Sequence, residues 1–359
     1  MFKFDQLKSV HLEITSRCQA SCPMCPRNYH SGRINPNLKI ADWTFQDFVK
    51  IFDNETLLQL SSIYFCGNFG DPIMNDDLIL MCQYLKNNAP NIDIRIHTNG
   101  GARNKKWWKE LKDSLPTNHI VIFALDGLED THHLYRVGTK YEVVINNAKE
   151  FISHGGIAEW VFIKFKHNQH QVSEAEQRSK DLGFNRFTIK NTIRFIGEKK
   201  FSVLDKDDVI QYYLEPPDNN QTTLIDKDAV DNFNTWYKET EINCYVLSNK
   251  EIYIDAHKNL FPCCFLASAP YNHPFVQPMI TEIRKKIVSQ YYELIESIGG
   301  IQKLDTMTRS IKDIINDDLW QSIWDLYWND KKLITCARTC GKTVFSKPND
   351  QFIKRVINV

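Results

Sequence analysis

Residues 10–27 read VHLEITSRCQASCPMCPR, a short β-rich run followed directly by a group of cysteines. The run Val10–Thr15 is rich in residues that favour a strand, so the cysteines should lie on the loop that follows it. They are spaced C-x3-C-x2-C and are Cys18, Cys22 and Cys25. Three thiolates on one short loop can hold three irons of a [4Fe–4S] cube, because cluster iron is bound by cysteine sulfur. The fourth iron then lacks a protein ligand and can take a small molecule.

Zinc is the alternative metal for these cysteines. A structural zinc needs a fourth ligand near the other three, and His30 is the only close candidate in the sequence. A chance grouping of core or surface cysteines is a second alternative. The spacing and the position after a strand favour the iron–sulfur cluster.

The first half of the chain repeats a strand-then-helix pattern. The predicted strands are Val10–Thr15, Ile63–Phe65, Ile92–His97, Ile120–Leu125, Trp160–Phe165 and Arg186–Lys190. The predicted helices are Thr44–Phe52, Asp76–Asn87, Lys105–Leu111, Tyr141–His154 and Ser173–Leu182, with Thr44 and Ser173 as N-caps and Gly183 as a C-cap. This alternation predicts an α/β fold with a parallel sheet and helical crossovers. Because no seventh unit is obvious, we expect an open, partial (β/α)6 TIM-like barrel, with its chemistry at the C-terminal ends of the strands.

The pattern changes after about residue 195. We therefore predict a barrel domain over residues 1–200 and a second, α+β domain of a hairpin plus helices over residues 201–359. Its predicted parts are a loop at 214–223, a helix at Ala229–Lys238, a hairpin of Ile252–Ile254 with Leu260–Phe261, and helices over 275–330. A tryptophan stripe in the helical part is predicted to be core and consists of Trp320, Trp324 and Trp328.

The bulk composition limits the partners of the chain. Lys and Arg together number 44, as do Asp and Glu, so no overall charge favours nucleic acid or an anionic membrane. The N-terminal stretch lacks the apolar core of a signal peptide, and the longest apolar run, Ile120–Leu125, is too short to cross a bilayer. We expect a cytoplasmic protein, in which the 10 cysteines are metal ligands, catalytic thiols or core residues rather than disulfides.

The cysteine motif, placed after the first strand of a partial barrel, resembles the radical S-adenosylmethionine (radical SAM) superfamily over about residues 8–195. Met24 stands before the third cysteine, where the family usually has an aromatic residue. The resemblance implies a [4Fe–4S] cluster whose open iron binds the amino and carboxylate groups of S-adenosyl-L-methionine (SAM). One electron from the cluster then cleaves SAM to methionine and a 5′-deoxyadenosyl radical, which abstracts hydrogen from a substrate. A low-potential electron donor is implied as a partner.

Two further segments are similar to SAM-binding segments of this family. Cys66–Pro72 (CGNFGDP) follows the second strand and resembles the Gly-Gly-Glu-Pro segment, with Phe69 replacing a glycine and Asp71 replacing the glutamate. Thr98–Gly101 (TNGG) follows the third strand and resembles the Thr-Asn-Gly segment near the ribose and the methionine carboxylate. The implied cofactor-binding residues are Gly67, Gly70, Asp71, Thr98, Asn99 and Gly100. Ordinary Gly-Asp-Pro and Asn-Gly turns are the alternative.

The stretch LDGLEDTHHLYR at residues 125–136 resembles the family's D-G-x(n)-R pattern. It implies that Asp126 points into the barrel mouth toward substrate or cofactor. Arg136 could bind a carboxylate through two parallel hydrogen bonds, and an ion pair on a helix surface is the alternative. These two residues are the catalytic candidates.

Several residues near these segments carry lesser predictions. Further pocket candidates at the end of the fifth strand are Lys164 and Asn168. We expect solvated loop residues at His132 and His133, and we expect core cysteines at Cys66 and Cys82.

The C-terminal cysteines resemble the SPASM/twitch extension of many radical SAM enzymes, in which a hairpin ending in Pro-Cys and later cysteines bind an auxiliary cluster. The ligands implied for an auxiliary [4Fe–4S] cluster are Cys244, Cys263, Cys336 and Cys340, with Cys264 as an alternative to Cys263. Adjacent side chains on an extended strand point to opposite faces, so only one of that pair should reach the cluster. Zinc bound by four cysteines is the alternative.

The sequence therefore predicts an iron–sulfur radical SAM enzyme. Family analogy favours a peptide or protein substrate. A nucleoside, a sugar or another small molecule is the alternative substrate class, and a zinc-dependent structural or binding protein is the alternative of another kind.

Overall fold

The computed structural model describes residues 1–192, 195, 199–218, 233–271, 278–341 and 355–358. Within these residues the main sheet has nine strands, in the order β10-β9-β1-β2-β3-β4-β5-β6-β11. Their bounds are β1 Ser9–Leu12, β2 Ser62–Phe65, β3 Asp93–Thr98, β4 His119–Ala124, β5 Ala158–Lys164, β6 Arg186–Asn191, β9 Glu251–Ile254, β10 Leu260–Phe261 and β11 Arg355–Asn358. A separate hairpin pairs β7 (Phe201–Leu204) with β8 (Ile210–Leu214).

The strands from β1 to β6 are parallel and neighbour one another in chain order. Each of the six strands predicted from the sequence is present, and the α/β partial-barrel architecture is confirmed. The first strand is shorter than predicted, because the ladder with β2 ends at Leu12. The residues that follow leave the sheet edge and lead into the cysteine loop.

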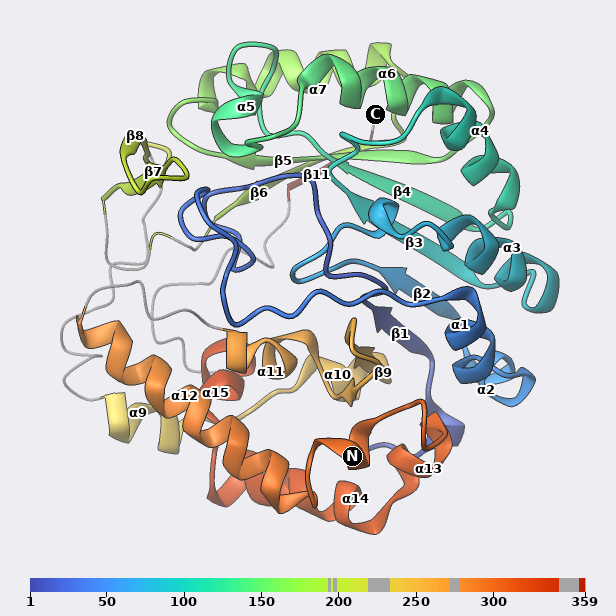
Figure 1. Cartoon of the computed structure of the whole chain (residues 1–359), viewed down its shortest axis with the longest axis vertical. Coiled ribbons are helices and arrows are strands. Elements are labelled where there is room, and N and C mark those ends of the chain that lie inside the picture. Colours follow the sequence, from blue (N-terminus) through green and yellow to red (C-terminus); the bar gives the residue numbers. More distant parts are fainter. Residues whose placement is uncertain (193–194, 196–198, 219–232, 272–277, 342–354, 359) are drawn as a thin grey trace.

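Helices connect the strands and cover the outer side of the sheet (Figure 1). Those of the barrel are α1 Phe45–Ile51, α2 Asn54–Gln59, α3 Leu78–Asn88, α4 Lys105–Ser114, α5 His132–Tyr135, α6 Tyr141–Ser153 and α7 Val172–Asp181, with 3-10 turns η1 Phe4–Gln6, η2 Pro72–Met74 and η3 Gln169–Gln171. The Thr44 side chain caps α1 by accepting a hydrogen bond from the Asp47 amide, as predicted. Gly183 follows α7 with a φ of +81°, a left-handed backbone that suits a C-cap glycine.

The prediction of Ser173 as an N-cap is wrong. The 3-10 turn η3 runs directly into α7, which begins one residue earlier, at Val172. Gln171 holds the N-cap position and its side chain makes no capping hydrogen bond. A continuous turn leaves no break in the chain at which a serine could cap the helix.

The sheet gains a seventh parallel strand, which the sequence predicted as part of a hairpin but not as a member of the barrel sheet. Strand β9 pairs with β1 in parallel register, Ser9 opposite Glu251, and β10 folds back on β9 as the predicted hairpin. The strand comes from beyond residue 200, so the predicted C-terminal region contributes directly to the barrel sheet. Its place in the sheet was hidden because about 60 residues separate β6 from β9, so the regular strand–helix spacing of the barrel is lost before β9 begins.

The C-terminal helices gather around this hairpin, on the far side of β1 from β2 (Figure 1). They are α9 Phe233–Glu239, α10 Tyr245–Asn249, α11 Cys264–Ala267, α12 Pro278–Ser297, α13 Ile311–Asn316, α14 Asp318–Asp325 and α15 Ile334–Cys340, with 3-10 turns η4 Ala269–Tyr271 and η5 Ile301–Leu304 and a π-helix η6 Leu326–Asp330. The predicted residues 219–223, 229–232 and 275–277 lie outside the described residues.

Side chains alternate along the barrel strands between an apolar outer face and a polar interior. Ile94, Ile96 and Phe123 are fully buried in the main hydrophobic core. Between them, Arg95 and His97 line an inner cavity. This period-two pattern packs the sheet against its helices and leaves polar groups inside the barrel. In the described part of the chain, no helix is long and apolar enough to cross a membrane.

Candidate functional site

The cysteine loop begins where β1 ends, at the C-terminal edge of the sheet. Backbone hydrogen bonds fold it tightly, with the Cys25 amide donating to the Cys22 carbonyl at 3.0 Å. The Cys18 sulfur accepts hydrogen bonds from the Ala20 amide at 3.4 Å and from Asn99 Nδ2 at 3.5 Å. Because N–H donors face the sulfur, this loop fits thiolates, which need such donors to offset their charge.

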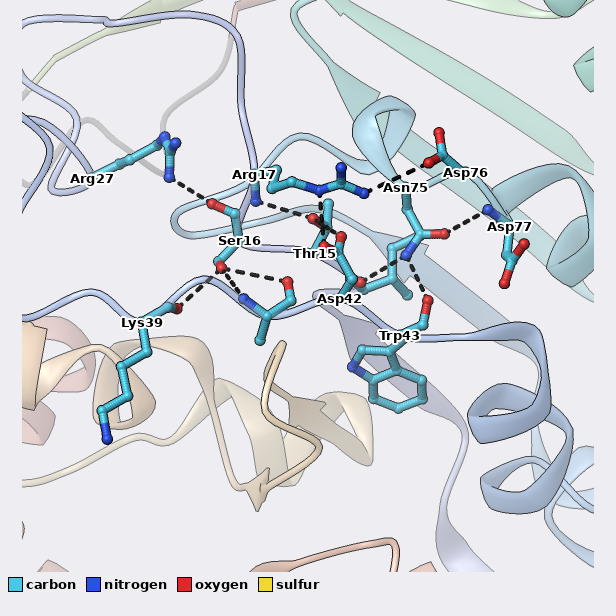
Figure 2. A network of polar contacts seen from close by, with 12 residues as sticks. Thr15, Ser16, Arg17, Arg27, Lys39, Asp42, Trp43, Asn75, Asp76 and Asp77 are labelled. Atoms are coloured by element: carbon cyan, nitrogen blue, oxygen red, sulfur yellow. Dashed lines mark hydrogen bonds and ion pairs between the residues drawn. The ribbon is translucent and has the colours of Figure 1, made fainter.

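A polar network fixes the residues that lead into the loop (Figure 2). The Ser16 hydroxyl accepts from the Ala41 amide at 2.8 Å, and the Ser16 carbonyl accepts from Arg27 Nη1 at 2.6 Å. Arg17 Nε lies 2.8 Å from Asp42 Oδ2, and Thr15 Oγ1 donates to the other Asp42 oxygen at 2.5 Å. These contacts hold the backbone before and after the cysteine loop. The protein scaffold therefore positions the cysteines even without a bound metal.

Glu13 organises the segment that follows β2. It is 1% exposed, and its Oε1 accepts hydrogen bonds from the Phe69 amide at 2.8 Å and the Gly70 amide at 3.0 Å. Its other oxygen accepts from the Tyr253 hydroxyl of β9. Burial raises the pKa of Glu13, and these donors partly offset the rise. One carboxylate thus joins β1, the glycine segment and the C-terminal hairpin.

The two glycines of that segment are required by close backbone approach. A Cβ at Gly70 would lie 1.8 Å from the Thr15 carbonyl oxygen, and a Cβ at Gly67 would lie 2.3 Å from the Gly70 carbonyl oxygen. No side chain can be accommodated at either distance, because both obstacles are backbone atoms. The segment therefore lies directly against the chain that enters the cysteine loop.

Asp71 is a buried hub between two strand ends. Its Oδ1 accepts from the Thr98 hydroxyl at 2.7 Å and its Oδ2 accepts from the Asn99 amide at 2.7 Å. It also caps η2 through the Ile73 amide. Burial raises the pKa of Asp71, and these hydrogen bonds lower it in part. Both carboxylate oxygens thus already accept hydrogen bonds from the protein, so a ligand would bind to the same oxygens in addition to these donors.

Asn99 connects the third strand to the cysteine loop. Besides its bond to Cys18, its Oδ1 accepts from Gln19 Nε2 at 2.6 Å and from the Gly101 amide at 2.8 Å. Gly100 has a φ of +67°, and a Cβ there would lie within 3.0 Å of the Phe123 and Val144 side chains. The predicted cofactor segments after β2 and β3 therefore lie beside the cysteines and are rigidly held.

Asp126 and Arg136 form a buried ion pair at the same edge. Arg136 Nε donates to Asp126 Oδ2 at 2.5 Å, and the Ile163 amide donates to Asp126 Oδ1 at 2.5 Å. Arg136 Nη1 lies 3.9 Å from the Cys22 sulfur. Burial would lower the pKa of the Arg136 guanidinium, but the Asp126 carboxylate outweighs burial and raises it. The surface ion pair that was the alternative for Arg136 is thus wrong, because its partner is a fully buried aspartate.

The cationic guanidinium also acts on the cysteine motif. Burial raises the pKa of Cys22 to about 11, while Arg136 lowers it. Burial raises the pKa of Cys18 as well, so the positive charge beside one sulfur and the N–H donors beside the other offset only part of the cost of anionic sulfur.

The second cysteine group is assembled from three elements that are far apart in the sequence. Cys244 precedes α10, Cys263 precedes α11, and α15 supplies Cys336 and Cys340. All four line one small cavity, and Cys264 is absent from its lining. The hydrogen bond with the Cys340 thiol lowers the pKa of Cys244 to about 7. The structure therefore brings together the four residues chosen from the sequence.

Within the described residues, no three His, Cys, Asp or Glu side chains already converge closely enough to hold a single metal ion.

Residues 12–189 match the radical SAM superfamily. This part of the chain is a radical SAM domain. The chain is 25% identical over 202 residues to the tungsten-containing aldehyde ferredoxin oxidoreductase cofactor-modifying protein of Pyrococcus furiosus, covering 54% of each protein. The match thus spans about half the length of this curated relative.

Solved structures show the same fold. Superposition on anSMEcpe with bound AdoMet gives a TM-score of 0.51 at 14% identity, covering 88% of this chain and 79% of that chain. Superposition on Streptococcus suis SuiB bound to its precursor peptide SuiA gives 0.50 at 13% identity, covering 89% and 67%. At these identities the likeness concerns the fold alone.

Four lesser predictions around the radical SAM domain need correction. His132 is not solvated: it is 1% exposed, and its Nε2 lies 2.8 Å from Thr139 Oγ1. Asn168 is no pocket residue, because its Oδ1 accepts from the Phe165 amide and its Nδ2 donates to the Asp126 carbonyl. Both side chains are therefore buried and hydrogen-bonded within the protein.

The other two corrections concern a cysteine and a tryptophan. Cys66 lies outside the hydrophobic core, with its sulfur 3.8 Å from His97 Nδ1 at the inner face of the barrel. Trp328 is only half-buried and lines the second cysteine cavity, whereas Trp320 and Trp324 are core as predicted. Cys82 is fully buried in the core, which confirms its prediction. His133 is exposed, as predicted.

His30, the zinc alternative's fourth ligand, is engaged elsewhere. Its Nδ1 lies 2.9 Å from the Ser202 carbonyl oxygen, and its ring stacks on Phe201 at 4.3 Å. Lys164, the other pocket candidate, ends β5 and is partly exposed.

Sequence reasoning missed Glu13 and Gln19, which hold the glycine segment and Asn99. Glu13 had a detectable signal, because a carboxylate inside the apolar run VHLEIT is costly to bury unless donors await it. Gln19 had none, since a glutamine inside a cysteine loop is compatible with solvent exposure.

Proposed function

We propose that this chain is a radical SAM enzyme in which Cys18, Cys22 and Cys25 hold a [4Fe–4S] cluster. When bound, the cluster supplies the electron that splits SAM into methionine and a 5′-deoxyadenosyl radical, and a low-potential donor replaces that electron. The observation that supports this best is the polar surround of the motif: Asn99 donates to the Cys18 sulfur and Arg136 lies beside the Cys22 sulfur. These donors stabilise sulfur in its anionic, metal-binding form.

The chain's own residues divide the remaining work. The glycine segment Gly67–Asp71 and the segment Thr98–Gly100 form the wall on which SAM would rest, since both lie beside Cys18 at the strand ends. Asp71 offers a carboxylate for the methionine ammonium while it keeps the Thr98 segment in place. The pair of Asp126 and Arg136 lies beside Cys22, and the guanidinium offers donors to the substrate or to the SAM carboxylate.

Replacing Cys18, Cys22 and Cys25 together by alanine tests the proposal. The variant should produce no 5′-deoxyadenosine from SAM under strong reduction, and its iron content should fall by about four atoms per chain, one cube's worth. A Cys82→Ala variant is the matched control, because that cysteine is buried in the core away from the site. Undiminished 5′-deoxyadenosine from the triple variant overturns the proposal.

The second cysteine group supports an auxiliary [4Fe–4S] cluster of the SPASM/twitch kind. Its four thiols line one cavity, which is the donor set that cubane clusters take. Zinc bound by the same four thiols is the second candidate, because the donor set suits it too. Iron, sulfide and zinc analysis of the anaerobically purified triple variant separates them: about four irons with sulfide indicate the cluster, and about one zinc indicates the alternative.

For the substrate we propose a peptide or protein. The support is analogy: similar folds include SuiB bound to a precursor peptide and anSMEcpe with bound AdoMet and the Kp18Cys peptide. A small molecule is the second candidate, because the curated relative is named a cofactor-modifying protein. Extract of the producing cells, split by size and treated or not with protease, should stimulate 5′-deoxyadenosine formation. Stimulation that a protease removes supports a peptide; stimulation in the small-molecule fraction contradicts it.

A further inference from the structure

The second cysteine cavity has one aromatic wall that no ligand role explains. Trp328 lines the cavity together with Cys336, Cys263, Cys244 and Cys340. Its indole ring is half-buried and packs on Trp324 with 5.7 Å between ring centroids. A tryptophan in contact with a metal-ligand cavity brings one polar atom, the indole N–H, into otherwise apolar surroundings.

That N–H lacks an ordinary partner. Trp328 Nε1 is buried and has no hydrogen-bond partner within the described part of the chain. Buried indole N–H groups normally find an acceptor, because an unpaired one costs free energy. The Cys336 thiol lines the same cavity, and burial raises the pKa of this thiol while the Trp328 indole lowers it in part. The sulfur is therefore the acceptor available to it.

The backbone around Trp328 is unusual in the same place. Helix α14 ends at Asp325, and the chain continues as a π-helix over Leu326–Asp330. The Lys331 amide donates to the Leu326 carbonyl at 2.8 Å, a bond to the fifth residue back. A π-turn changes the direction of the side chains that it carries and is frequent at functional sites. Trp328 thus departs from the core stripe of Trp320 and Trp324 and lies at the cavity.

Trp320 and Trp324 serve as internal comparisons. Their Nε1 atoms also lack a partner in the described residues, but neither residue lines the cavity. An unpaired indole N–H is therefore not sufficient evidence for a role at the cysteine cavity. Among these three tryptophans, only Trp328 combines an unpaired N–H with a π-turn and a position in the cavity lining.

We propose that Trp328 donates its indole N–H to the Cys336 sulfur and thereby raises the reduction potential of the auxiliary cluster. This rests on the proposed auxiliary cluster. A hydrogen bond to a ligand sulfur draws electron density away from the iron, so it stabilises the reduced, more negative state. The effect is strong where water is excluded, because the local dielectric constant is low. Trp328 acts through Cys336 and is a positioning residue, not a catalytic one.

The test uses the chain that carries C18A, C22A and C25A, so that only the second cluster remains. Its midpoint potential is measured by a redox titration followed by electron paramagnetic resonance, with and without W328F. The W328F variant should titrate at a more negative potential, and W324F should match the parent. Equal potentials for W328F and its parent overturn the inference, as does an equal shift in W324F.

A second measurement covers the case in which W328F loses its cluster or fails to fold. In the same parent chain labelled with indole-15N tryptophan, pulsed electron paramagnetic resonance of the reduced cluster should detect a 15N coupling and an exchangeable proton. Absence of both overturns the inference. If the parent holds no iron–sulfur cluster at all, the auxiliary-cluster proposal itself fails, which is distinguishable from an unchanged potential.

Discussion

The two cysteine groups of this protein are built in opposite ways. Cys18, Cys22 and Cys25 lie on one loop at the end of β1, and polar groups such as Asn99 and Arg136 face their sulfurs. The second group comes from the ends of α10, α11 and α15, and its cavity is lined mostly by cysteines and apolar side chains. Ordering the first loop costs little loop-closure entropy, whereas the second group closes long stretches of chain. The first is therefore a local feature, and the second exists only when the tertiary fold does.

Glu13 lies shortly before the first group in the sequence and is hydrogen-bonded to the hairpin from which the second group takes Cys263. Its carboxylate accepts from the glycine segment and from Tyr253 on the hairpin. The Glu13 carboxylate therefore connects the two regions, and a substitution on the hairpin should affect the glycine segment through it.

The largest expected effect separates Cys263 from Cys264. Cys263→Ala should remove the second group's metal almost completely, because Cys263 lines its cavity. Cys264→Ala should retain it, since Cys264 does not line that cavity. The measurement is metal content per chain in the C18A, C22A, C25A background. Equal loss in both variants contradicts the assembly of this group as described.

Next in size is the loss of SAM affinity on Asp71→Asn. If the Asp71 carboxylate also holds the SAM ammonium, removing its charge should weaken binding by about 10- to 150-fold, the value of a charge-assisted hydrogen bond of about 1.5–3 kcal/mol. Equilibrium binding of SAM to the reconstituted enzyme measures it. Thr98→Val is the control, because it removes one hydrogen bond to Asp71 without changing the carboxylate.

An unchanged dissociation constant for Asp71→Asn means that the carboxylate only joins the ends of β2 and β3. A loss in Thr98→Val as large as that in Asp71→Asn would lead to the same conclusion.

A smaller effect, on stability, is expected for the hydrogen bond between Tyr253 and Glu13. Tyr253→Phe leaves one oxygen of buried Glu13 without its hydroxyl donor and should cost about 1–3 kcal/mol of unfolding free energy in urea. Glu13→Gln should cost a similar amount, because its neutral oxygen is a weaker acceptor for the backbone amides and its nitrogen cannot accept from the Tyr253 hydroxyl. The double variant should be less destabilised than the sum, by about 0.5–3 kcal/mol. If the two losses of unfolding free energy simply add in the double variant, the hairpin and the glycine segment are energetically independent.

The last expected effect concerns pH. Burial raises the pKa of Asp255, in the hairpin turn, to about 7 and that of Glu251, at the start of β9, to about 7. A carboxyl whose pKa is higher in the folded state binds protons more tightly when folded, so stability falls as pH rises from about 4 to about 7. Thermal unfolding of wild type and Asp255→Asn at pH 5 and pH 8 should show a smaller decline in the variant. An equal decline in both contradicts the assignment to Asp255.

The positions of the candidate site residues were predictable where these residues directly follow a strand. Asp71, Thr98 and Asn99 were chosen from segments at strand ends, and parallel strands bring such ends to one edge. The pairing of Asp126 with Arg136, at a sequence separation of 10, was not foreseen, because the residues between them give no indication that the chain turns back into the barrel. His132 was misjudged for the same reason, since a histidine in a polar stretch looks solvated until the fold buries it.

The sequence by itself determined the barrel and its first cysteine group. Strand and helix periodicity and the C-x3-C-x2-C spacing are local properties, so they survive without knowledge of any distant contact. The tertiary structure alone decided that β9 extends the sheet beside β1, that Glu13 joins three segments, and that Cys263 rather than Cys264 lines the second cavity. Each of these depends on which surfaces meet across more than 50 residues of chain, and the order of residues along a chain does not encode that meeting in any short pattern.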